Sequence, residues 1–346
     1  MSDTEIYSFA LGLASKDSKG GIIEVYYPDP RLNPSSEIAR VVLASERYTT
    51  GNGFWELSKE DLDSLQSKFF ASDEKSLAEI CKKIRLSDKV KLLTVIRENN
   101  APSSIPEAFL QLHLLSHRLA KPNELNLGGI FSILRNIAWT NKGAITVEDL
   151  PKKQLEARIK GEVLEVYSID KFPKMTNYIV PDGVRVADAA RIRLGAHIGE
   201  GTTVMHEGFV NFNAGTEGTA MVEGRVSAGV VIGENTDLGG SCSTMGTLSG
   251  GGTEIISVGK NCLIGANAGI GIPLADGCIV EAGLYVTAGT KVNLIDGDGK
   301  LIKTVKAKEI SSIKDLLFRR NSLSGAVECI PTKSTISLND ALHTHN

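Results

Sequence analysis

The sequence predicts three parts: a mixed α/β domain at residues 1–180, a parallel β-helix at 181–292 and a short C-terminal β segment at 293–346. Three observations predict this fold class. Of the 35 glycines, 25 lie among the 117 residues from 183 to 299. Aliphatic residues recur every six positions in that stretch, and only eight of the 70 residues from 221 to 290 are charged. A flexible linker would also be rich in glycine but would lack the recurring aliphatic residues.

The region before residue 180 alternates between strand-like and helix-like hydrophobic patterns. Runs of β-forming residues predict strands at 5–13, 21–27 and 41–45. Apolar residues at helical spacing predict five helices: one beginning near Ser58 and carrying Leu62, Leu65 and Phe69, one carrying Leu77, Ile80, Cys81 and Ile84, one with Pro106 just inside its start, one over 130–139, and one capped by Thr146.

The six-residue period is the strongest signal in the chain. It runs in four series: Ile192 to Val222, Val226 to Thr244, Val258 to Ile270, and Val280 to Val292. A glycine often follows the aliphatic residue, as in Ile198-Gly199. We therefore expect each six-residue unit to form a short strand and a corner, with three units closing one triangular coil and the aliphatic residue pointing inward.

The phase of the period slips between the series, and the longest step is the one from Thr244 to Val258, which is two residues more than two repeats. The surplus lies around Leu248–Gly252, which we expect to be a loop expelled from a corner. Loops expelled from one face of a repeat protein commonly build sites, so a functional loop is favoured over a merely tolerated insertion. After Lys291 the period lapses, and Asp296–Gly299 predicts a hairpin turn.

Composition and motifs exclude several classes of protein. A net charge of −3 and a pI of about 6.1 give no reason to expect a nucleic-acid or membrane partner. No apolar run approaches the roughly 20 residues that span a bilayer, and the first residues do not resemble a secretory signal. The five cysteines are widely spaced and form no CxxC pair, which predicts reduced thiols and a cytoplasmic protein.

Common catalytic motifs are also missing from the sequence. It contains no P-loop, no GxSxG elbow and no GxGxxG at a strand–helix turn. Only His197 and His206 lie within the repeats, whereas a three-histidine zinc site needs a third. His113 and His117 are four residues apart, but no HExxH-like glutamate accompanies them, so packing is expected there.

The best catalytic candidate from the residues alone is Glu223. It directly follows an inward apolar residue, so we expect it to point outward near a corner, and the glycine at 224 would leave room for a substrate. A carboxylate placed there could act as a general base. The alternative is a surface ion pair between Glu223 and Arg225.

Six motifs occur in order between residues 182 and 328: NFNAGT, MVEGR, MGTLSGGGT, CLIGANAGIGI, EAGLYVTAGTKV and LLFRRNSLSGAVE. Together they resemble the tetrahydrodipicolinate N-succinyltransferases, in the longer form that carries a mixed N-terminal domain. The resemblance implies a left-handed β-helix and a homotrimer with sites between subunits. It also implies transfer of a succinyl group from succinyl-CoA to the amino group of ring-opened tetrahydrodipicolinate, on the succinylase route to lysine and meso-diaminopimelate.

The resemblance also implies roles for particular residues. The glutamate of MVEGR, Glu223, would be catalytic, either as a base or by accepting the acyl group. The backbone N–H of Gly246 would stabilise the thioester oxyanion. Lys306 and Arg319 carry the charge to meet phosphates, although Arg319 and Arg320 could simply be solvated. The succinyl-CoA contacts implied are Arg225, Gly240, Ser243, Ala266, Glu281, Ala282, Gly289, Lys306, Leu316, Leu317, Phe318 and Arg319.

The acceptor is a dicarboxylate, so its site should hold cations, and the candidates by charge are Arg191, Arg193 and Arg225. The resemblance implies Mg²⁺ on the trimer axis, with Glu207 as one ligand. Some relatives have an acidic residue where this chain has Ala190, and Asp188 lies two residues away. Two other functions stay open: a different CoA-dependent acyltransferase of the hexapeptide-repeat class that uses His206, and a non-catalytic scaffold.

Overall fold

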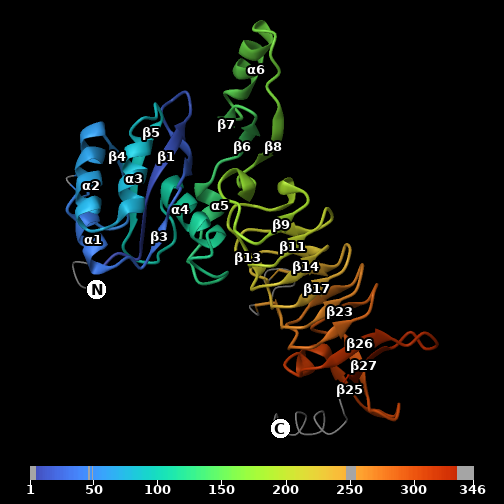
Figure 1. Cartoon of the computed structure of the whole chain (residues 1–346). Helices are drawn as coiled ribbons and strands as arrows, with labels where there is room; N and C mark the ends of the chain where they lie inside the picture. The colour runs from blue at the N-terminus through green and yellow to red at the C-terminus, as the bar shows by residue number, and fades with distance from the viewer. Residues whose placement is uncertain (1–4, 46, 49, 247–254, 333–346) are drawn as a thin grey trace. The chain divides into compact units, whose positions relative to one another are not determined.

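The computed structural model describes residues 5–45, 47–48, 50–246 and 255–332 (Figure 1). The chain divides into two compact units. The first comprises Met1–Pro173 and Asn177–Ile179, and the second comprises Lys174–Thr176 and Val180–Asn346. None of the helices in the described ranges has the length and apolar character needed to cross a membrane.

The first unit is built on an antiparallel sheet. Its strands follow the order β2 (Ile22–Tyr26), β1 (Ser8–Lys16), β5 (Val90–Ile96) and β4 (Gly53–Leu57), and β3 (Arg31–Leu32) also pairs with β1. Three helices bury their apolar sides in one core with this sheet: α1 (Ser36–Leu43), α2 (Lys59–Ala71) and α3 (Lys75–Ile84). Alternation of buried and exposed residues along β2 follows from the period of two in a strand.

Three of the predicted helices are confirmed. Helix α2 begins after Ser58, whose Oγ accepts a hydrogen bond from the N–H of Asp61 at 3.1 Å, while Asp61 Oδ2 accepts from the N–H of Ser58 at 2.7 Å. Helix α3 buries Leu77, Cys81 and Ile84 as predicted. Helix α4 (Ile105–Ser116) carries Pro106 in its first turn.

The predicted strand at 41–45 is wrong, because most of this run lies in helix α1. Ser35 caps the helix by accepting from the N–H of Ile38 at 3.3 Å. Ile38 and Val42 are buried on the face that meets the core. The β-branched residues that suggested a strand therefore pack as one apolar side of a helix, since a cap and tertiary burial outweigh local propensity.

The predicted helix at 130–139 is only partly right. Helix α5 (Ile130–Ile133) covers its first turn, and strand β6 (Ile137–Thr140) covers its end. Strand β6 pairs with β7 (Gly143–Thr146) and β8 (Val166–Asp170), so long-range pairing decides this segment. Thr146 is likewise not a cap, because helix α6 (Leu150–Ile159) begins after Asp149. Instead, Oγ1 of Thr146 donates a hydrogen bond to Oδ2 of Asp149 at 2.8 Å, in the turn that precedes the helix.

The second unit is a stack of coils made from parallel strands, drawn from yellow-green to orange in Figure 1. The strands of successive coils line up on three faces. The first face holds β9 (Arg185–Val186), β11 (Thr203–Val204), β14 (Ala220–Val222), β17 (Thr236–Leu238), β20 (Leu263–Ile264) and β22 (Ile279–Val280). The second holds β12 (Phe209–Val210), β15 (Arg225–Val226), β18 (Ser243–Thr244), β21 (Gly269–Gly271) and β23 (Tyr285–Thr287). The third holds β10 (Ala196–Ile198), β13 (Ala214–Thr216), β16 (Val231–Ile232) and β19 (Ser257–Val258).

The six-residue period is confirmed by burial, because every residue in the four predicted series between Ile192 and Val292 is buried. The register stacks these residues on one another, as Val210 pairs with Val226 and Ile270 with Val286. Thr244 is the polar member of its stack, and its Oγ1 donates to the carbonyl of Arg225 at 2.8 Å. The interior of the prism is therefore apolar or internally hydrogen-bonded.

The interruption of the period is visible in the pairing. Gly215 pairs with His197, eighteen residues earlier, and with Val231, sixteen residues later. Val231 pairs next with Ser257, twenty-six residues later, so one coil carries the insertion. The proposed functional loop at Leu248–Gly252 lies outside the described residues.

The C-terminal part contains the predicted hairpin. Strands β24 (Lys291–Ile295) and β25 (Leu301–Lys306) are antiparallel, and the N–H of Gly299 donates to the carbonyl of Asp296 at 3.1 Å in the turn. Strands β26 (Leu316–Arg320) and β27 (Val327–Pro331) follow, and β26 pairs in parallel with β22. Three short 3-10 helices complete the elements: η1 (Met175–Asn177), η2 (Ala189–Arg191) and η3 (Ala307–Ile310). The five cysteines are free and buried, as predicted.

Candidate active site

Two kinds of corner organise the site on the prism. The first corner joins the first face to the second, and it comprises residues 205–208, 223–224, 239–242, 265–268 and 281–284 on successive coils. The second corner joins the second face to the third and includes residues 227–230 and the start of the long connection at 245–246. Nearly all the predicted site residues before residue 290 lie on the first corner or the second face.

Glu223 is half-buried on the first corner, immediately after β14. Its N–H donates to the carbonyl of Leu238 at 2.9 Å, and its carbonyl accepts from the N–H of Ser241 at 3.1 Å. Both ends of its backbone are thus tied to the next coil. Within the described ranges, no residue donates a hydrogen bond to its carboxylate, so that group is available to a ligand.

The ion pair between Glu223 and Arg225, the alternative to a catalytic role, is not found among the described residues. Arg225 Nη2 instead donates to Ser243 Oγ at 3.0 Å on the neighbouring strand. Strand registers place Arg225 between Phe209 and Ser243 on the second face. The two charged residues therefore lie in different parts of the prism, with Glu223 on the first corner and Arg225 on the second face.

The predicted role of Gly224 is wrong. A Cβ at this position would overlap Sγ and the carbonyl oxygen of Cys242 in the next coil, so the missing side chain allows two coils to approach closely. It leaves no room for a substrate. Gly240 is different, because a Cβ there would meet only Glu223 Oε2, at 3.7 Å. The open space beside the Glu223 carboxylate therefore lies over Gly240.

Cys242 is the thiol nearest to this site, and it is inert. Burial raises its pKa to about 12, with the Glu223 carboxylate raising it further against the opposing influence of Arg225. A thiol with such a pKa is almost entirely protonated at neutral pH and is a poor nucleophile. On this coil, Glu223 rather than Cys242 is therefore the catalytic candidate.

The first corner presents small residues along the prism. Three backbone hydrogen bonds link successive coils here. The N–H of Ser241 donates to the carbonyl of Glu223, that of Asn267 donates to the carbonyl of Gly240 at 2.9 Å, and that of Gly283 donates to the carbonyl of Ala266 at 2.8 Å. These bonds place Glu223, Gly240, Ala266 and Ala282 at equivalent positions on successive coils. The line continues to β26, where Glu281 N–H donates to the carbonyl of Phe318 at 2.9 Å. A ledge of glycine and alanine thus leads from the carboxylate to the C-terminal strands.

Gly246 lies on the second corner, at the start of the long connection. A Cβ there would stand 3.3 Å from the carbonyl oxygen of Ala228, so the backbone is closely packed. In the described part of the chain no group accepts a hydrogen bond from its N–H. This N–H can therefore bind an oxyanion, but it belongs to a different corner from Glu223.

The two side chains predicted to bind the nucleotide, Lys306 and Arg319, differ in how far they are already engaged by the protein. Arg319 is tied to Glu328, with Nη2 3.0 Å from Oε2. Arg320 donates its backbone N–H to Glu281 Oε2 at 2.7 Å. Lys306 lies opposite Lys291 in the β24–β25 pair, and both are exposed. Sequence reasoning missed Lys291, although the hairpin turn at 296–299 already set this register.

The remaining predicted contacts divide by burial. Gly289, Glu281 and Ala282 are exposed, and Leu317 is half-buried. Leu316 and Phe318 are fully buried, so only their backbones can reach a ligand. Ser243 is 8% exposed and presents its hydroxyl to Arg225.

The three candidate arginines for a dicarboxylate have distinct surroundings. Arg191 donates to the carbonyls of Glu207 at 2.9 Å and Gly208 at 3.2 Å, so it braces the first corner. Arg193 donates to Asn211 Oδ1 at 3.1 Å and lies over the ring of Phe209, 5.9 Å from its centroid. Phe209 is also the register partner of Arg225 in the sheet, so Arg193 and Arg225 are both neighbours of this residue on the second face. Sequence reasoning also missed Phe209.

The predicted metal residue Glu207 is exposed on the first corner, one coil before Glu223. Asp188, two residues before Ala190, accepts a hydrogen bond at Oδ1 from the N–H of Ala190 at 2.9 Å. In the described residues of this chain, no three acidic, histidine or cysteine side chains gather as a metal site. The candidate zinc pair is also excluded: His113 Nδ1 hydrogen-bonds the carbonyl of Phe109 at 2.7 Å, and Nε2 accepts from Tyr27 N–H at 3.2 Å.

Comparisons with known proteins agree with this geometry. A family model described as the hexapeptide repeat of succinyl-transferase matches residues 255–288. The stacked prism and this match thus define a hexapeptide-repeat acyltransferase of the succinyl-transferase kind. A second model, for the middle part of tetrahydrodipicolinate N-succinyltransferase, matches residues 134–174. The chain belongs to the tetrahydrodipicolinate N-succinyltransferase family.

Relatives support that assignment along the whole chain. A Pseudomonas putida protein named 2,3,4,5-tetrahydropyridine-2,6-dicarboxylate N-succinyltransferase is 57% identical over 346 residues, covering 100% of both chains. A Vibrio cholerae protein of the same name is 50% identical and covers 98% of this chain and 99% of its own. A Campylobacter jejuni crystal structure described as a 2,3,4,5-tetrahydropyridine-2-carboxylate N-succinyltransferase has a TM-score of 0.88 at 31% identity, over 96% of this chain and 94% of that one.

Proposed function

We propose that this chain transfers the succinyl group of succinyl-CoA to the amino group of ring-opened tetrahydrodipicolinate, a step in lysine and meso-diaminopimelate biosynthesis. Membership of the family and the names of relatives at 50–57% identity support this reaction. The observation that carries it is the Glu223 carboxylate, which is held by its backbone at the head of a ledge of small residues and is free of described donors.

The chemistry requires a neutral amine, because an ammonium ion has no lone pair. Glu223 takes the proton from the attacking nitrogen, which then bonds to the thioester carbon. The C–S bond breaks, and the CoA thiolate leaves and is protonated. The N–H of Gly246 hydrogen-bonds the oxygen that becomes negative. Transient acylation of Glu223 is the second route open to the same carboxylate.

The ledge along the first corner suits the pantetheine arm of succinyl-CoA, which is long and mostly uncharged. Gly240, Ala266 and Ala282 expose backbone rather than side chains along this line. The nucleotide end would meet the C-terminal segment at 293–346, whose Lys306 lies opposite Lys291 in the β24–β25 pair. Like charges opposite one another repel, and a bound phosphate would relieve that repulsion.

The acceptor carboxylates fit the second face. Arg193 lies over the ring of Phe209, Arg225 is the strand partner of Phe209, and the guanidinium groups of both arginines can pair with a carboxylate. Arg191 is less suited to direct binding, since its guanidinium already holds two backbone carbonyls. We assign it to positioning the corner that carries Glu207.

A homotrimer of left-handed prisms, with sites between subunits, is supported by membership of the family and by the placement of the proposed catalytic groups. Glu223 lies on the first corner, just before β15, and Gly246 lies on the second corner, just after β18 of the neighbouring coil. One chain therefore presents its base and its oxyanion donor at different corners. A ring in which the first corner of one chain meets the second corner of the next would bring them together.

Magnesium on the axis of that trimer would be structural. The Glu207 carboxylate is exposed and accepts no described hydrogen bond, so three copies could offer oxygen ligands, directly or through water. We expect the chain to act in the cytoplasm, where its five free thiols stay reduced.

The deciding experiment is a thiol-release assay with tetrahydrodipicolinate or 2-aminopimelate as acceptor, comparing succinyl-CoA with acetyl-CoA. Acceptor-dependent release from succinyl-CoA, at least ten times faster than from acetyl-CoA, is expected. Release from acetyl-CoA at an equal or higher rate would point to a different acyltransferase. If neither donor releases its thiol, the proposed reaction is wrong and a non-catalytic scaffold is the remaining function.

A further inference from the structure

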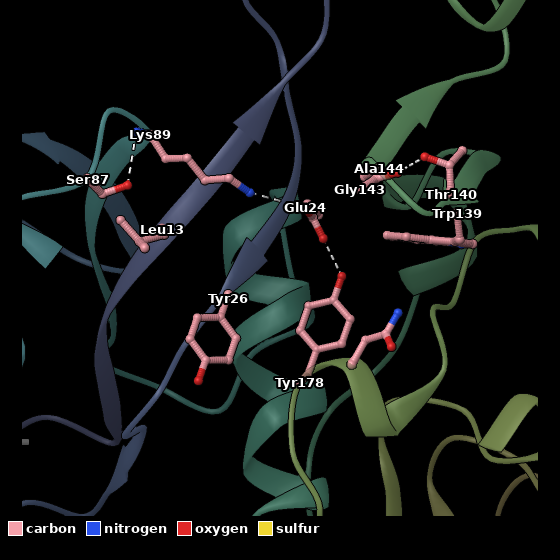
Figure 2. A pocket seen from close by; sticks show the side chains of 11 residues that line it. Leu13, Glu24, Tyr26, Ser87, Lys89, Trp139, Thr140, Gly143, Ala144 and Tyr178 are labelled. Atoms are coloured by element: carbon pink, nitrogen blue, oxygen red, sulfur yellow. Dashed lines mark hydrogen bonds and ion pairs between the residues drawn. The ribbon is translucent and has the colours of Figure 1, made fainter. Parts of the chain in front are cut away.

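The first unit contains a cavity of about 530 Å³ that the reaction does not use (Figure 2). This volume lies within the range of ordinary small-molecule sites. Its walls come from the edge of the main sheet, from the β6–β7 hairpin and from the segment before residue 180. They comprise Leu13, Glu24, Tyr26, Ser87, Lys89, Trp139, Thr140, Gly143, Ala144, Asn177 and Tyr178.

A fixed carboxylate forms one side of the cavity. Glu24 lies opposite Ser15 in the β1–β2 pair, and Ser15 Oγ donates to Glu24 Oε1 at 2.7 Å. The hydroxyl of Tyr178 donates to Glu24 Oε2, as Figure 2 shows. The Glu24 side chain is only 13% exposed. Two donors thus hold the carboxylate in place and leave its remaining lone pairs facing the cavity.

Tyr178 itself is rigidly packed. Its ring centroid is 5.4 Å from that of His113 and 6.5 Å from that of Tyr26. Burial and the Glu24 charge raise the pKa of its phenol, so the hydroxyl remains a donor. The carboxylate therefore stays an acceptor-only group whose orientation is fixed before any ligand arrives.

Aromatic rings surround this carboxylate. Tyr26 and Tyr178 lie below it in Figure 2, and Trp139 reaches toward it from the hairpin. Trp139 Nε1 donates to the carbonyl of Asp170 at 3.0 Å, which fixes the indole ring. Ring faces attract cations and pack against apolar groups. A carboxylate among three aromatic side chains is therefore suited to a ligand ammonium attached to an apolar body.

A lysine supplies the opposite charge. Lys89 Nζ is 4.0 Å from Glu24 Oε1. It also donates a hydrogen bond to Ser15 Oγ at 3.1 Å. The Lys89 side chain is 55% exposed, so separating this ion pair costs little free energy. The carboxylate and the ammonium thus stand side by side at the cavity, separated by about the distance between the two charged groups of an α-amino acid.

We propose that this cavity binds a free α-amino acid with an apolar or aromatic side chain, its ammonium on Glu24, its carboxylate on Lys89 and its side chain against Trp139 and Tyr26. The charges of the cavity sum to zero, which suits a zwitterion better than an amine or an acid alone. This site is separate from the succinyl-transfer residues, and it stands whether or not the proposed reaction is correct.

Trp139 provides the readout. The chain has two tryptophans, so Trp55→Phe leaves Trp139 as the sole indole reporter. The full-length Trp55→Phe protein would be titrated with L-phenylalanine and L-leucine, and with 2-phenylethylamine and 3-phenylpropionate, which each lack one charge. We expect saturable changes in fluorescence with the amino acids at a Kd of about 1 mM or tighter, and at least tenfold weaker binding of the analogues.

Two variants test the charges, each against a matched control. Glu24→Gln and Lys89→Met should each weaken L-phenylalanine binding at least tenfold. Glu79→Gln and Lys82→Met, from an exposed ion pair on α3, should leave it unchanged. All four proteins should keep normal succinyl transfer. The proposal is overturned if no amino acid binds below 10 mM, if the single-charge analogues bind equally well, or if Glu24→Gln and Lys89→Met both bind like the parent.

Discussion

Arg225 donates a hydrogen bond to Ser243 Oγ at 3.0 Å and makes no described ion pair with Glu223, two residues before it. The carboxylate is consequently not neutralised by the nearest cation. Because strands of the second face pair in register, Arg225 points along the face while Glu223 stays on the corner. This separation lets one residue handle a proton and the other bind a carboxylate.

Replacing Glu223 with glutamine should abolish most turnover. The amide keeps the size of the side chain but cannot take a proton from the amine, so kcat should fall by about 10²- to 10⁴-fold. His206→Ala is the comparison, because His206 is the exposed alternative base one coil earlier. Steady-state thiol release measures both. Loss of turnover only in the histidine variant would contradict the assignment.

Gly224→Ala should destabilise the β-helix. A methyl group there would overlap Cys242, so the two coils would have to move apart. Overpacking of this kind costs about 1–3 kcal/mol, which thermal unfolding would register as a lower Tm. Gly289→Ala is the control, because a Cβ at Gly289 meets nothing within 4 Å. Equal Tm values for the two variants would show that the coils are not closely packed at Gly224.

Removing either lysine of the Lys291–Lys306 pair should weaken succinyl-CoA binding. Lys291→Met and Lys306→Met should each raise the KM for succinyl-CoA by about threefold to tenfold, with kcat little changed, since each loses one charge-assisted contact with phosphate. Lys300→Met, in the adjoining exposed turn, should have no effect. If all three variants behave alike, general surface charge rather than a phosphate site explains the result.

Arg193→Met should affect the acceptor rather than the donor. Loss of the guanidinium over Phe209 removes one cation from the dicarboxylate site, so the KM for the acceptor should rise at least tenfold. The KM for succinyl-CoA should stay constant. Arg185→Met, on the first face, provides the control. A rise in the succinyl-CoA KM alone would move Arg193 to the donor site.

The first unit should lose stability as the pH falls below about 6.5. Burial lowers the pKa of His113 to about 3 and that of His117 to about 4, whereas both have ordinary values near 6.5 when exposed. Between these values the unfolded chain binds more protons, so stability declines with decreasing pH. His113→Leu should flatten the dependence of Tm on pH between 6.5 and 4, and His206→Ala should not. An unchanged slope in His113→Leu would mean that other groups dominate.

Much of the second unit was predictable because a six-residue repeat in the sequence specifies its architecture. A buried residue every six positions sets the length of each strand, and burial from Ile192 to Val292 follows it throughout. The corner position of Glu223 followed from its place after an inward residue. The use of Gly224 did not, because it depends on Cys242, eighteen residues away.

The first unit was less predictable, for a related reason. Residues 41–45 have strand propensity, yet Ser35 caps a helix there and the core accepts its apolar side. Residues 137–140 continue a helical pattern but pair with strands that follow later in the chain. Local propensities differ by less than the free energy of such packing and pairing.

By itself, the sequence determined the coiled prism and the place of Glu223 on one of its corners, since both depend on spacing along the chain. The tertiary structure alone decided that Arg225 turns to Ser243, that Lys291 stands beside Lys306, and that Glu24 meets Tyr178 at a cavity. These relationships join residues distant in sequence, and no local period encodes which of them will come into contact.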